Sequence, residues 1–317
     1  MSFCVLEDLH PLVGRDARAT AGGTPALLYA NRILLSRLFL RLAGASLLFS
    51  LFLLTGCGNP GVANKAPAVN LPPTISTSNG GNSGNPFSKV QSSGGWGQFG
   101  QGPPTFVDCS PSPCDGITFL MTQGISSPSM SGHAAKFDLG GTAVYTDALF
   151  NNHLIGPFSS QGLPDTNGAL VPALHDFTYD VYFYGDNLGL SQALEFDVNQ
   201  FFDSKGFIWG HECRIAGGNE WDVWDNVNGH WTPTGVACFP NSNAWNHVTI
   251  RVQRTSNDQL LYQSITFNGV THNLNLTFAP GSAPSNWYGV TINYQMDGNY
   301  RQDPYSVYLD NLTFSCQ

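Results

Sequence analysis

The second half of the chain alternates apolar and polar residues in short runs, and this pattern restricts the possible fold more than any other feature. The clearest run is Leu-Glu-Phe-Asp-Val-Asn at positions 194–199. Side chains along a β-strand point alternately to opposite faces, so the apolar residues of this run share one face and Glu195, Asp197 and Asn199 share the other. We therefore expect a strand with one face on a core and its acidic and amide face available to a ligand.

Further runs of this kind are rich in β-branched and aromatic residues and are separated by Gly, Asn, Asp and Pro. They lie at 134–139, 143–150, 176–184, 193–201, 207–215, 220–226, 245–254, 260–268, 270–276, 288–294 and 305–314. Between two of them, Asn268-Gly269 is a strong hairpin signal because a type I′ turn needs positive φ. This pattern predicts an all-β protein, an antiparallel β-sandwich of the jelly-roll type, over residues 105–317.

The N-terminal part has the features of an export signal. Arg32, Arg37 and Arg41 precede an apolar run at 42–54 that is too short to span a bilayer, which needs roughly 20 apolar residues. The run ends in Leu-Thr-Gly-Cys, which resembles the lipobox of bacterial lipoproteins, so Cys57 is the predicted lipidation site. We therefore expect residues 1–56 to be a leader and lipoprotein signal peptide, and the protein to be anchored by lipid in the cell envelope, at the outer membrane or outside the cell.

Residues 57–104 have the composition of a flexible linker. Gly, Asn, Pro and Ser make up 29 of the 47 residues at 58–104, and such a segment buries too little apolar surface to offset the entropy of ordering. Only Trp96 and Phe99 depart from this composition. We expect a disordered tether that ends at the sandwich.

The charge of the exported chain makes nucleic acid a poor partner. Residues 57–317 contain 8 Lys and Arg against 19 Asp and Glu. Binding to nucleic acid depends on basic side chains that neutralise phosphates. The composition favours a neutral ligand or a cation, and a monomeric protein is expected.

The cysteines indicate an oxidising compartment. Of seven cysteines, Cys213 and Cys238 bracket the tryptophan-rich stretch and form the predicted disulfide. A second disulfide is expected among Cys109, Cys114 and Cys316: either Cys109 pairs with Cys114, or one of these two pairs with Cys316. Each alternative leaves one of the three thiols free. No pair has the spacing of a structural zinc module.

Tryptophans follow the acidic run at high density. Aromatic rings can pack against the C–H faces of sugars while neighbouring acidic and amide groups bind hydroxyls. We expect Glu195, Asp197, Asn199, Trp209, Asp222, Trp224 and Trp231 to converge on one open ligand-binding trough. Trp221 and Trp224 differ by an odd number of residues, so they face opposite sides of a strand, and Trp221 is the predicted core residue.

Three segments together resemble the concanavalin A-like lectin/glucanase superfamily. They are the Glu195-Phe-Asp-Val run, the Trp245-Asn-His-Val strand start and the closing Val307-Tyr-Leu-Asp-Asn-Leu run. The resemblance covers residues 134–316 and implies a jelly-roll carbohydrate-binding domain. In its family-16 glycosidases this strand carries Glu-x-Asp and then a second Glu, whereas here Asn199 and Gln200 stand in its place.

Two other uses of the same residues stay open. A glycosidase needs two carboxyl groups, about 5–5.5 Å apart for retention and about 6.5–9.5 Å for inversion. Residues two apart on a strand are separated by roughly 6.6 Å, so Glu195 and Asp197 are the candidate catalytic pair of an enzyme. Calcium binds carboxylate and carbonyl oxygens, and Asp310 resembles the last-strand calcium ligand of some carbohydrate-binding modules.

The sequence thus predicts an exported, lipid-anchored, lectin-like domain that binds a polysaccharide or other glycan, with calcium as a possible cofactor. The enzyme alternative is a glycoside hydrolase or polysaccharide lyase on the same face, although the missing second Glu weighs against it. The third alternative is a surface adhesion or structural domain.

Overall fold

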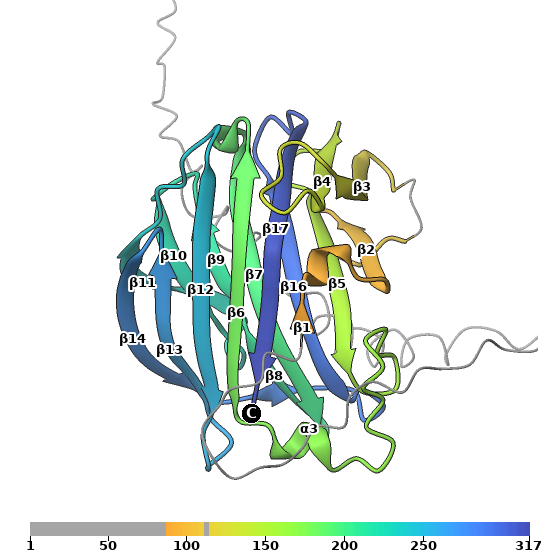
Figure 1. Cartoon of the computed structure of the whole chain (residues 1–317). Coiled ribbons are helices and arrows are strands. Elements are labelled where there is room, and N and C mark those ends of the chain that lie inside the picture. Colours follow the sequence, from red (N-terminus) through yellow and green to blue (C-terminus); the bar gives the residue numbers. More distant parts are fainter. Residues whose placement is uncertain (1–86, 111–113) are drawn as a thin grey trace, which may run out of the picture. The chain divides into compact units, whose positions relative to one another are not determined.

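The computed structural model describes residues 87–110 and 114–317, which form two antiparallel β-sheets. The chain moves repeatedly from one sheet to the other, as in a jelly roll, because β4, β6 and β17 belong to sheet A while β5, β7 and β16 belong to sheet B. Figure 1 shows β12, β6 and β17 of sheet A side by side. The predicted all-β antiparallel sandwich is confirmed.

Sheet A has the strand order β14-β13-β12-β6-β17-β4-β3, and the short strand β1 pairs with β17. Its strands are β1 (Phe87–Ser88), β3 (Ile117–Ile125), β4 (Ala134–Gly141), β6 (Asp176–Gly185), β12 (Trp245–Arg254), β13 (Leu260–Phe267), β14 (Val270–Phe278) and β17 (Tyr305–Cys316). The Asn268-Gly269 turn joins β13 to β14, and both residues have positive φ, as predicted for this hairpin.

Sheet B has the strand order β11-β10-β9-β7-β16-β5-β2, and β8 pairs with both β7 and β15. Its strands are β2 (Trp96–Gln101), β5 (Asp147–Ile155), β7 (Ser191–Phe202), β8 (Lys205–Trp209), β9 (His211–Arg214), β10 (Glu220–Asp225), β11 (His230–Ala237), β15 (Gly281–Ser282) and β16 (Gly289–Gly298). The described residues also contain three short helical segments: η2 (Val90–Ser92), α3 (Leu170–Ala173) and η3 (Leu188–Leu190).

The core lies between the sheets and is filled by alternate residues of each strand. In β7, Leu194, Phe196 and Val198 are fully buried in it, and Phe196 packs against Tyr179 and Phe183 of sheet A. The predicted division of β7 into an apolar and a polar face is therefore confirmed. It leaves Glu195, Asp197 and Asn199 on the face of sheet B that points away from sheet A, which we call the outer face of sheet B.

The predicted linker extends too far. Residues 87–101 contain β1, η2 and β2, and β2 forms the edge of sheet B by pairing with β5. The Trp96 ring packs edge-on against Phe137 of the core at a centroid distance of 5.9 Å. These apolar contacts order a segment whose average composition is that of a linker, so the boundary at residue 104 is corrected to a position before residue 87.

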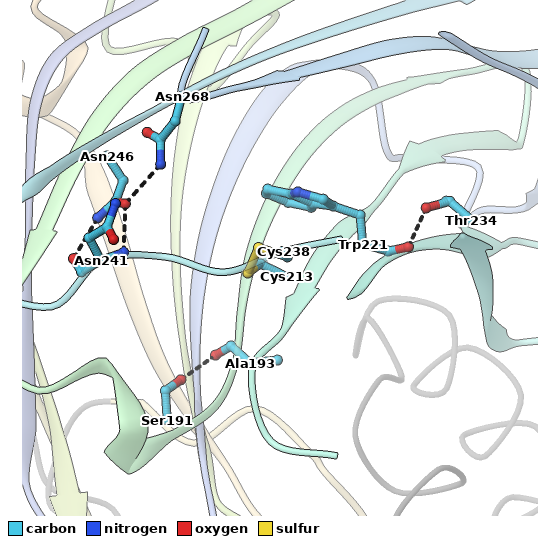
Figure 2. Close-up of a disulfide and its surroundings, with 9 residues drawn as sticks. All are labelled: Ser191, Ala193, Cys213, Trp221, Thr234, Cys238, Asn241, Asn246 and Asn268. Carbon is cyan, nitrogen blue, oxygen red and sulfur yellow. Dashed lines mark hydrogen bonds between the residues drawn. A yellow bond between two sulfur atoms is a disulfide. The ribbon is translucent and has the colours of Figure 1, made fainter. Parts of the chain in front are cut away.

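Two disulfides are present. Cys213 and Cys238 form the predicted bridge, and Cys109 pairs with Cys114. Figure 2 shows the first bridge beside Trp221, which lies directly opposite Cys213 in the β9–β10 pair. Among the cysteines that the structure describes, Cys316 is the free thiol, and burial raises its pKa to about 12. The two disulfides fit an oxidising compartment.

The predicted leader and the lipidation site Cys57 lie outside the described residues. Within the described part of the chain, no helix combines the length and the apolar character needed to cross a lipid bilayer.

Candidate ligand-binding site

The outer face of sheet B carries polar residues on its two central strands. In the register of β7 with β16, Glu195 lies opposite Gln295, Asp197 opposite Asn293, and Asn199 opposite Thr291. The polar row predicted from one strand is therefore a two-strand array. The signal for the second strand was present in the sequence as the alternating run Thr-x-Asn-x-Gln-x-Asp at 291–297.

These paired side chains contact one another. The Gln295 Nε2 donates to Glu195 Oε1 at 2.8 Å, and Asn293 Nδ2 donates to Asp197 Oδ2 at 3.4 Å. Asn199 Nδ2 donates to Thr291 Oγ1 at 3.2 Å. Each of Glu195, Asp197 and Asn199 is at most 3% exposed.

A cavity of about 400 Å³ lies at one end of this array. Its volume falls within the range of roughly 300–1,000 Å³ that is typical of ligand pockets. Apolar and aromatic side chains from four strands and two loops form its walls: Phe99, Leu149, Phe158, Phe201, Ile208 and Trp287. Amides and other polar groups complete the lining: Asn151, Asn199, Asn286, Asn293, His153, Thr291, Tyr288 and Asp108.

Local sequence explains how the walls are placed. Phe99 in β2 lies opposite Leu149 in β5, and Asn199 in β7 lies opposite Ile208 in β8, so four cavity residues come from regular strand pairs. Trp287 follows β15, and its ring meets that of Phe201 edge-on at 5.1 Å and 83°. The cavity therefore has a floor of strand residues and one wall supplied by the loop before β16.

Polar atoms on this face lack partners within the protein. They are Asp197 Oδ1, Asn199 Oδ1, Gln295 Oε1, Asp297 Oδ2, Trp224 Nε1 and Trp231 Nε1. Buried polar groups normally have a hydrogen-bond partner, because leaving one unpaired costs roughly 1–3 kcal/mol. Four of the six are acceptors, so a ligand that satisfies them must bring donors such as hydroxyl groups.

The structure brings only one of the predicted ligand residues into the cavity. Asn199 lines it, while Asp197 reaches it through its hydrogen bond to the lining residue Asn293. Glu195 lies further along β7, where it is enclosed by Gln295 and Asp297, so its predicted direct contact with a ligand is not supported by the cavity geometry.

The predicted tryptophans fall into two groups. Trp224 and Trp231 pack together at 5.2 Å beside Phe201 and Ile208, which places them behind one wall of the cavity. Trp209 is buried in the core against Phe177 of sheet A at 5.3 Å, so its assignment to the ligand face is corrected.

Trp221 and Asp222 of β10 lie on opposite faces of sheet B. Trp221 is fully buried in the core, as the parity of the strand predicts. Asp222 shares the outer face of sheet B, but both of its carboxylate oxygens accept hydrogen bonds from Arg214, at 2.7 and 3.2 Å. Asp222 therefore has a protein partner and is not brought to the cavity.

Comparisons with known proteins do not assign the chain to a family. No protein-family model matches it, and no curated protein matches it. Three solved structures to which it is similar are the carbohydrate esterase vb_24B_21 from the Shiga toxin-encoding bacteriophage phi24B, a protein with carbohydrate-binding modules of the β-sandwich superfamily, and lectin UEA-II complexed with galactose.

The similarity to these structures is distant. The esterase is 13% identical, with a TM-score of 0.39 and coverage of 74% of this chain and 99% of its own. The protein with carbohydrate-binding modules is 8% identical, with a TM-score of 0.34 and coverage of 71% of this chain and 58% of its own. The lectin is 10% identical, with a TM-score of 0.34 and coverage of 70% of this chain and 98% of its own. At these values no function is transferred to the chain.

Five carboxyl groups form a band on the outer face of sheet B next to the cavity. This acidic band consists of Asp147, Glu195, Asp197, Glu212 and Asp297. Burial raises the pKa of all five, and it brings the pKa of Asp197 and of Asp297 to about 7. For Glu195 the charge of Asp297 is the next cause after burial. Proton donors and acceptors that operate near neutral pH are thus present on this face.

Asp310, the predicted metal ligand, holds a loop in place. Its carboxylate accepts hydrogen bonds from Ser129 Oγ, the Met130 backbone N–H, and both the Oγ and the backbone N–H of Ser131, over 2.6–2.9 Å. Gln91 Nε2 and the Asn311 N–H donate as well. Burial alone would raise the pKa of Asp310, but these hydrogen bonds outweigh burial and hold it at about 2.

Residues 87–110 and 114–317 contain no group of three or more His, Cys, Asp or Glu side chains placed to hold a metal ion. Calcium therefore stays a prediction of the sequence.

Sequence reasoning missed most of the cavity walls. Phe99 lay in the presumed linker, and Trp287 lay in a proline-flanked and serine-flanked segment before a predicted strand. Both are large aromatic residues in segments otherwise poor in apolar side chains, and this isolation is the signal that could have identified them.

Proposed function

We propose that this chain is an exported carbohydrate-binding protein and that the cavity on the outer face of sheet B is its site. The observation that carries the proposal is the meeting of aromatic and amide groups there. Trp287 and Phe201 offer apolar walls, and Asn199 lines the same space with a side chain whose Oδ1 has no partner in the protein. Sugars match this pattern, because their C–H faces pack on aromatic rings while their hydroxyls donate to acceptors.

The polar lining favours an uncharged contact at the cavity itself. Asn151, Asn199 and Asn293 are neutral, and burial lowers the pKa of His153 below its ordinary value, so the imidazole is uncharged at neutral pH. Asp108 is the one carboxyl group of the lining; Gln101 Nε2 donates to it at 3.0 Å, and burial raises its pKa. A phosphate or sulfate would find no cation among these groups. Hydroxyl groups are the ligand donors that fit them.

The proposal includes the cellular setting. The Leu-Thr-Gly-Cys segment supports lipidation at Cys57 and anchoring in the cell envelope. The proposal also places the β-sandwich in the concanavalin A-like superfamily and takes the protein to be a monomer. Labelling cells with a radioactive or clickable fatty acid tests the anchor: the label enters the wild-type chain and is absent from Cys57→Ser. Label on the Cys57→Ser chain would contradict lipidation at this residue.

A glycan array tests the binding function directly. The full chain, expressed with its own leader and purified, should bind a defined group of oligosaccharides. Trp287→Ala should lose that binding because it removes a cavity wall. Trp245→Ala is the matched control, since Trp245 is a half-buried tryptophan on strand β12 of sheet A. If Trp287→Ala binds as well as Trp245→Ala does, the cavity is not the binding site. If the wild-type protein binds no oligosaccharide on the array, the proposed carbohydrate-binding function is wrong.

The acidic band supports a second candidate, a polysaccharide hydrolase or lyase. Carboxyl groups with a pKa of about 7 are suited to general acid and base chemistry. Release of reducing ends from a polysaccharide, lost in Glu195→Gln, would establish this activity. Binding without turnover favours the lectin-like function, and failure of both assays favours an adhesion or structural domain.

A further inference from the structure

We infer that the outer face of sheet B selects glycans that carry protonated amino groups over their N-acetylated equivalents, with the acidic band as the subsite for the amine. This inference rests on the proposed function, since it assumes that a glycan occupies the neighbouring cavity. It adds the chemical class of that glycan.

The first support is the imbalance of charge. The strands of sheet B contain two basic residues, Lys205 in β8 and Arg214 in β9, and Lys205 is paired with Asp258 at 2.7 Å. The same strands place all five carboxyl groups of the acidic band on the outer face of sheet B. A cation that reaches these groups favours their ionised form, because it offsets the repulsion between the carboxylates.

Arg214 does not neutralise the band. Its guanidinium forms ion pairs with Asp222 at 2.7 Å and with Glu220 at 3.1 Å, and it also donates to the Gly217 carbonyl oxygen. These partners use four of the five N–H donors of the guanidinium. Neither Arg214 nor Lys205 forms an ion pair with a residue of the band, although the charge of Arg214 lowers the pKa of Glu212.

The carboxyl groups of the band lie on neighbouring strands. Asp147 is directly opposite Asp297 in the β5–β16 pair, and Glu195 is directly opposite Glu212 in the β7–β9 pair. Opposite residues on adjacent strands have Cβ atoms roughly 4.5–5.5 Å apart. Like charges at this separation repel, and the pKa of Asp147 and of Glu212 is raised by burial and then by the charge of Asp297.

An orphaned acceptor inside the band points to a ligand. Gln295 is 2% exposed, and its Nε2 donates to Glu195 Oε1 at 2.8 Å and to Asp297 Oδ1 at 2.9 Å. This leaves Gln295 Oε1 without a donor, and Asp297 Oδ2 has none either. An ammonium group carries three N–H donors and one positive charge, so it supplies what both oxygens lack.

The band adjoins the lining of the cavity through Asn293. Asn293 lines the cavity and donates to Asp197, and Gln295 follows two residues later on the same face of β16. One sugar ring held in the cavity would therefore place the substituent of the next ring toward Asp197 and Gln295. Binding of the ammonium would stabilise the ionised carboxylates, and the proton that leaves the band would pass to solvent.

Calorimetry on the full chain with two matched probes tests the inference. The probes are the tetrasaccharide of glucosamine and the tetrasaccharide of N-acetylglucosamine, measured at about pH 6 and low salt. We expect the amine to bind at least about tenfold more tightly, a difference that shrinks as salt screens the charges. We also expect the binding enthalpy of the amine to vary with the ionisation enthalpy of the buffer, because a proton is released.

Asp297→Asn removes one carboxyl group of the band and should abolish most of the preference while it leaves binding of the N-acetylated probe within about twofold. Asp138→Asn is the control, because Asp138 is paired with Lys136 on β4 of sheet A. The salt dependence of the preference and the buffer dependence of the binding enthalpy are measured on the wild type. They therefore test the inference even if Asp297→Asn does not fold. Equal binding of both probes by the wild type overturns the inference alone, whereas binding of neither overturns it together with the proposed function.

Discussion

Gln295 lies directly opposite Glu195 across the β7–β16 pair, and its amide nitrogen donates a hydrogen bond of 2.8 Å to the Glu195 carboxyl group. The same nitrogen donates to Asp297, so one amide joins two acidic groups. Glu195 is therefore part of a buried polar network rather than an isolated side chain facing solvent. The behaviour of this network with pH gives a direct check on it.

We predict that the free energy of unfolding decreases as pH rises from about 5 to 8. The folded-state pKa of Asp197 and of Asp297 is about 7, above the ordinary value of 3.8, because burial disfavours the charged form. Such groups contribute stability below pH 4 and lose it as pH rises through 7. A rise of this size corresponds to on the order of 4 kcal/mol for one carboxyl group.

Thermal unfolding at a series of pH values checks this prediction. Asp297→Asn should flatten the pH dependence, because an amide cannot ionise. Asp138→Asn, which changes a carboxyl group paired with Lys136 on sheet A, should leave the dependence as it is in the wild type. A melting temperature that rises steadily between pH 5 and pH 8 would contradict the assignment of raised pKa values.

Asp310 should have the opposite dependence on pH and a large effect on stability. Its folded-state pKa of about 2 is below the ordinary value, so its contribution is present above pH 4 and is lost as pH falls toward 2. We predict that Asp310→Ala lowers the free energy of unfolding by roughly 3 kcal/mol or more, because six donors, among them the Nε2 of the buried Gln91, lose an ionised acceptor.

Chemical denaturation measures this loss, with Asp138→Ala as a control in a half-exposed ion pair that should cost at most about 1 kcal/mol. Protein donors already occupy both oxygens of Asp310, so we expect calcium and EDTA to leave its contribution unchanged. A calcium-dependent rise in melting temperature that disappears in Asp310→Ala would show that this aspartate is a metal ligand after all.

The strands that could be predicted from the sequence are those with local alternation. Strand β12 has the predicted bounds, and β6, β7 and β13 differ from their predictions by two residues or fewer at each end. Strand β3 (Ile117–Ile125) was missed because alternate residues of this edge strand are exposed and include Leu120, which weakens its periodicity.

The site was less predictable because it depends on contacts between distant segments. Alternation along β7 correctly placed Glu195, Asp197 and Asn199 on one face, but it could not show that Gln295 would enclose Glu195. Trp209 could not be assigned to the core from its own strand, because its position depends on contact with Phe177 of sheet A. Phe99 and Trp287 meet at the cavity from segments nearly two hundred residues apart.

The two disulfides should contribute unequally to stability. Cys213–Cys238 closes 25 residues and Cys109–Cys114 closes 5. The chain-entropy relation gives roughly 3.5 kcal/mol for the longer loop and roughly 2 kcal/mol for the shorter one. Double Cys→Ala variants compared by chemical denaturation check this order, and a larger loss from removal of the Cys109–Cys114 bridge would contradict it.

The central claim is that the Trp287 and Asn199 cavity binds a sugar. Titration calorimetry of the full chain with an oligosaccharide that it binds on the array tests this claim most directly. We predict that Trp287→Ala and Asn199→Ala each weaken binding by at least about tenfold, because each removes a wall or an unpaired acceptor of the cavity. Trp245→Ala should bind as the wild type does, whereas unchanged affinity in both cavity variants would contradict the claim.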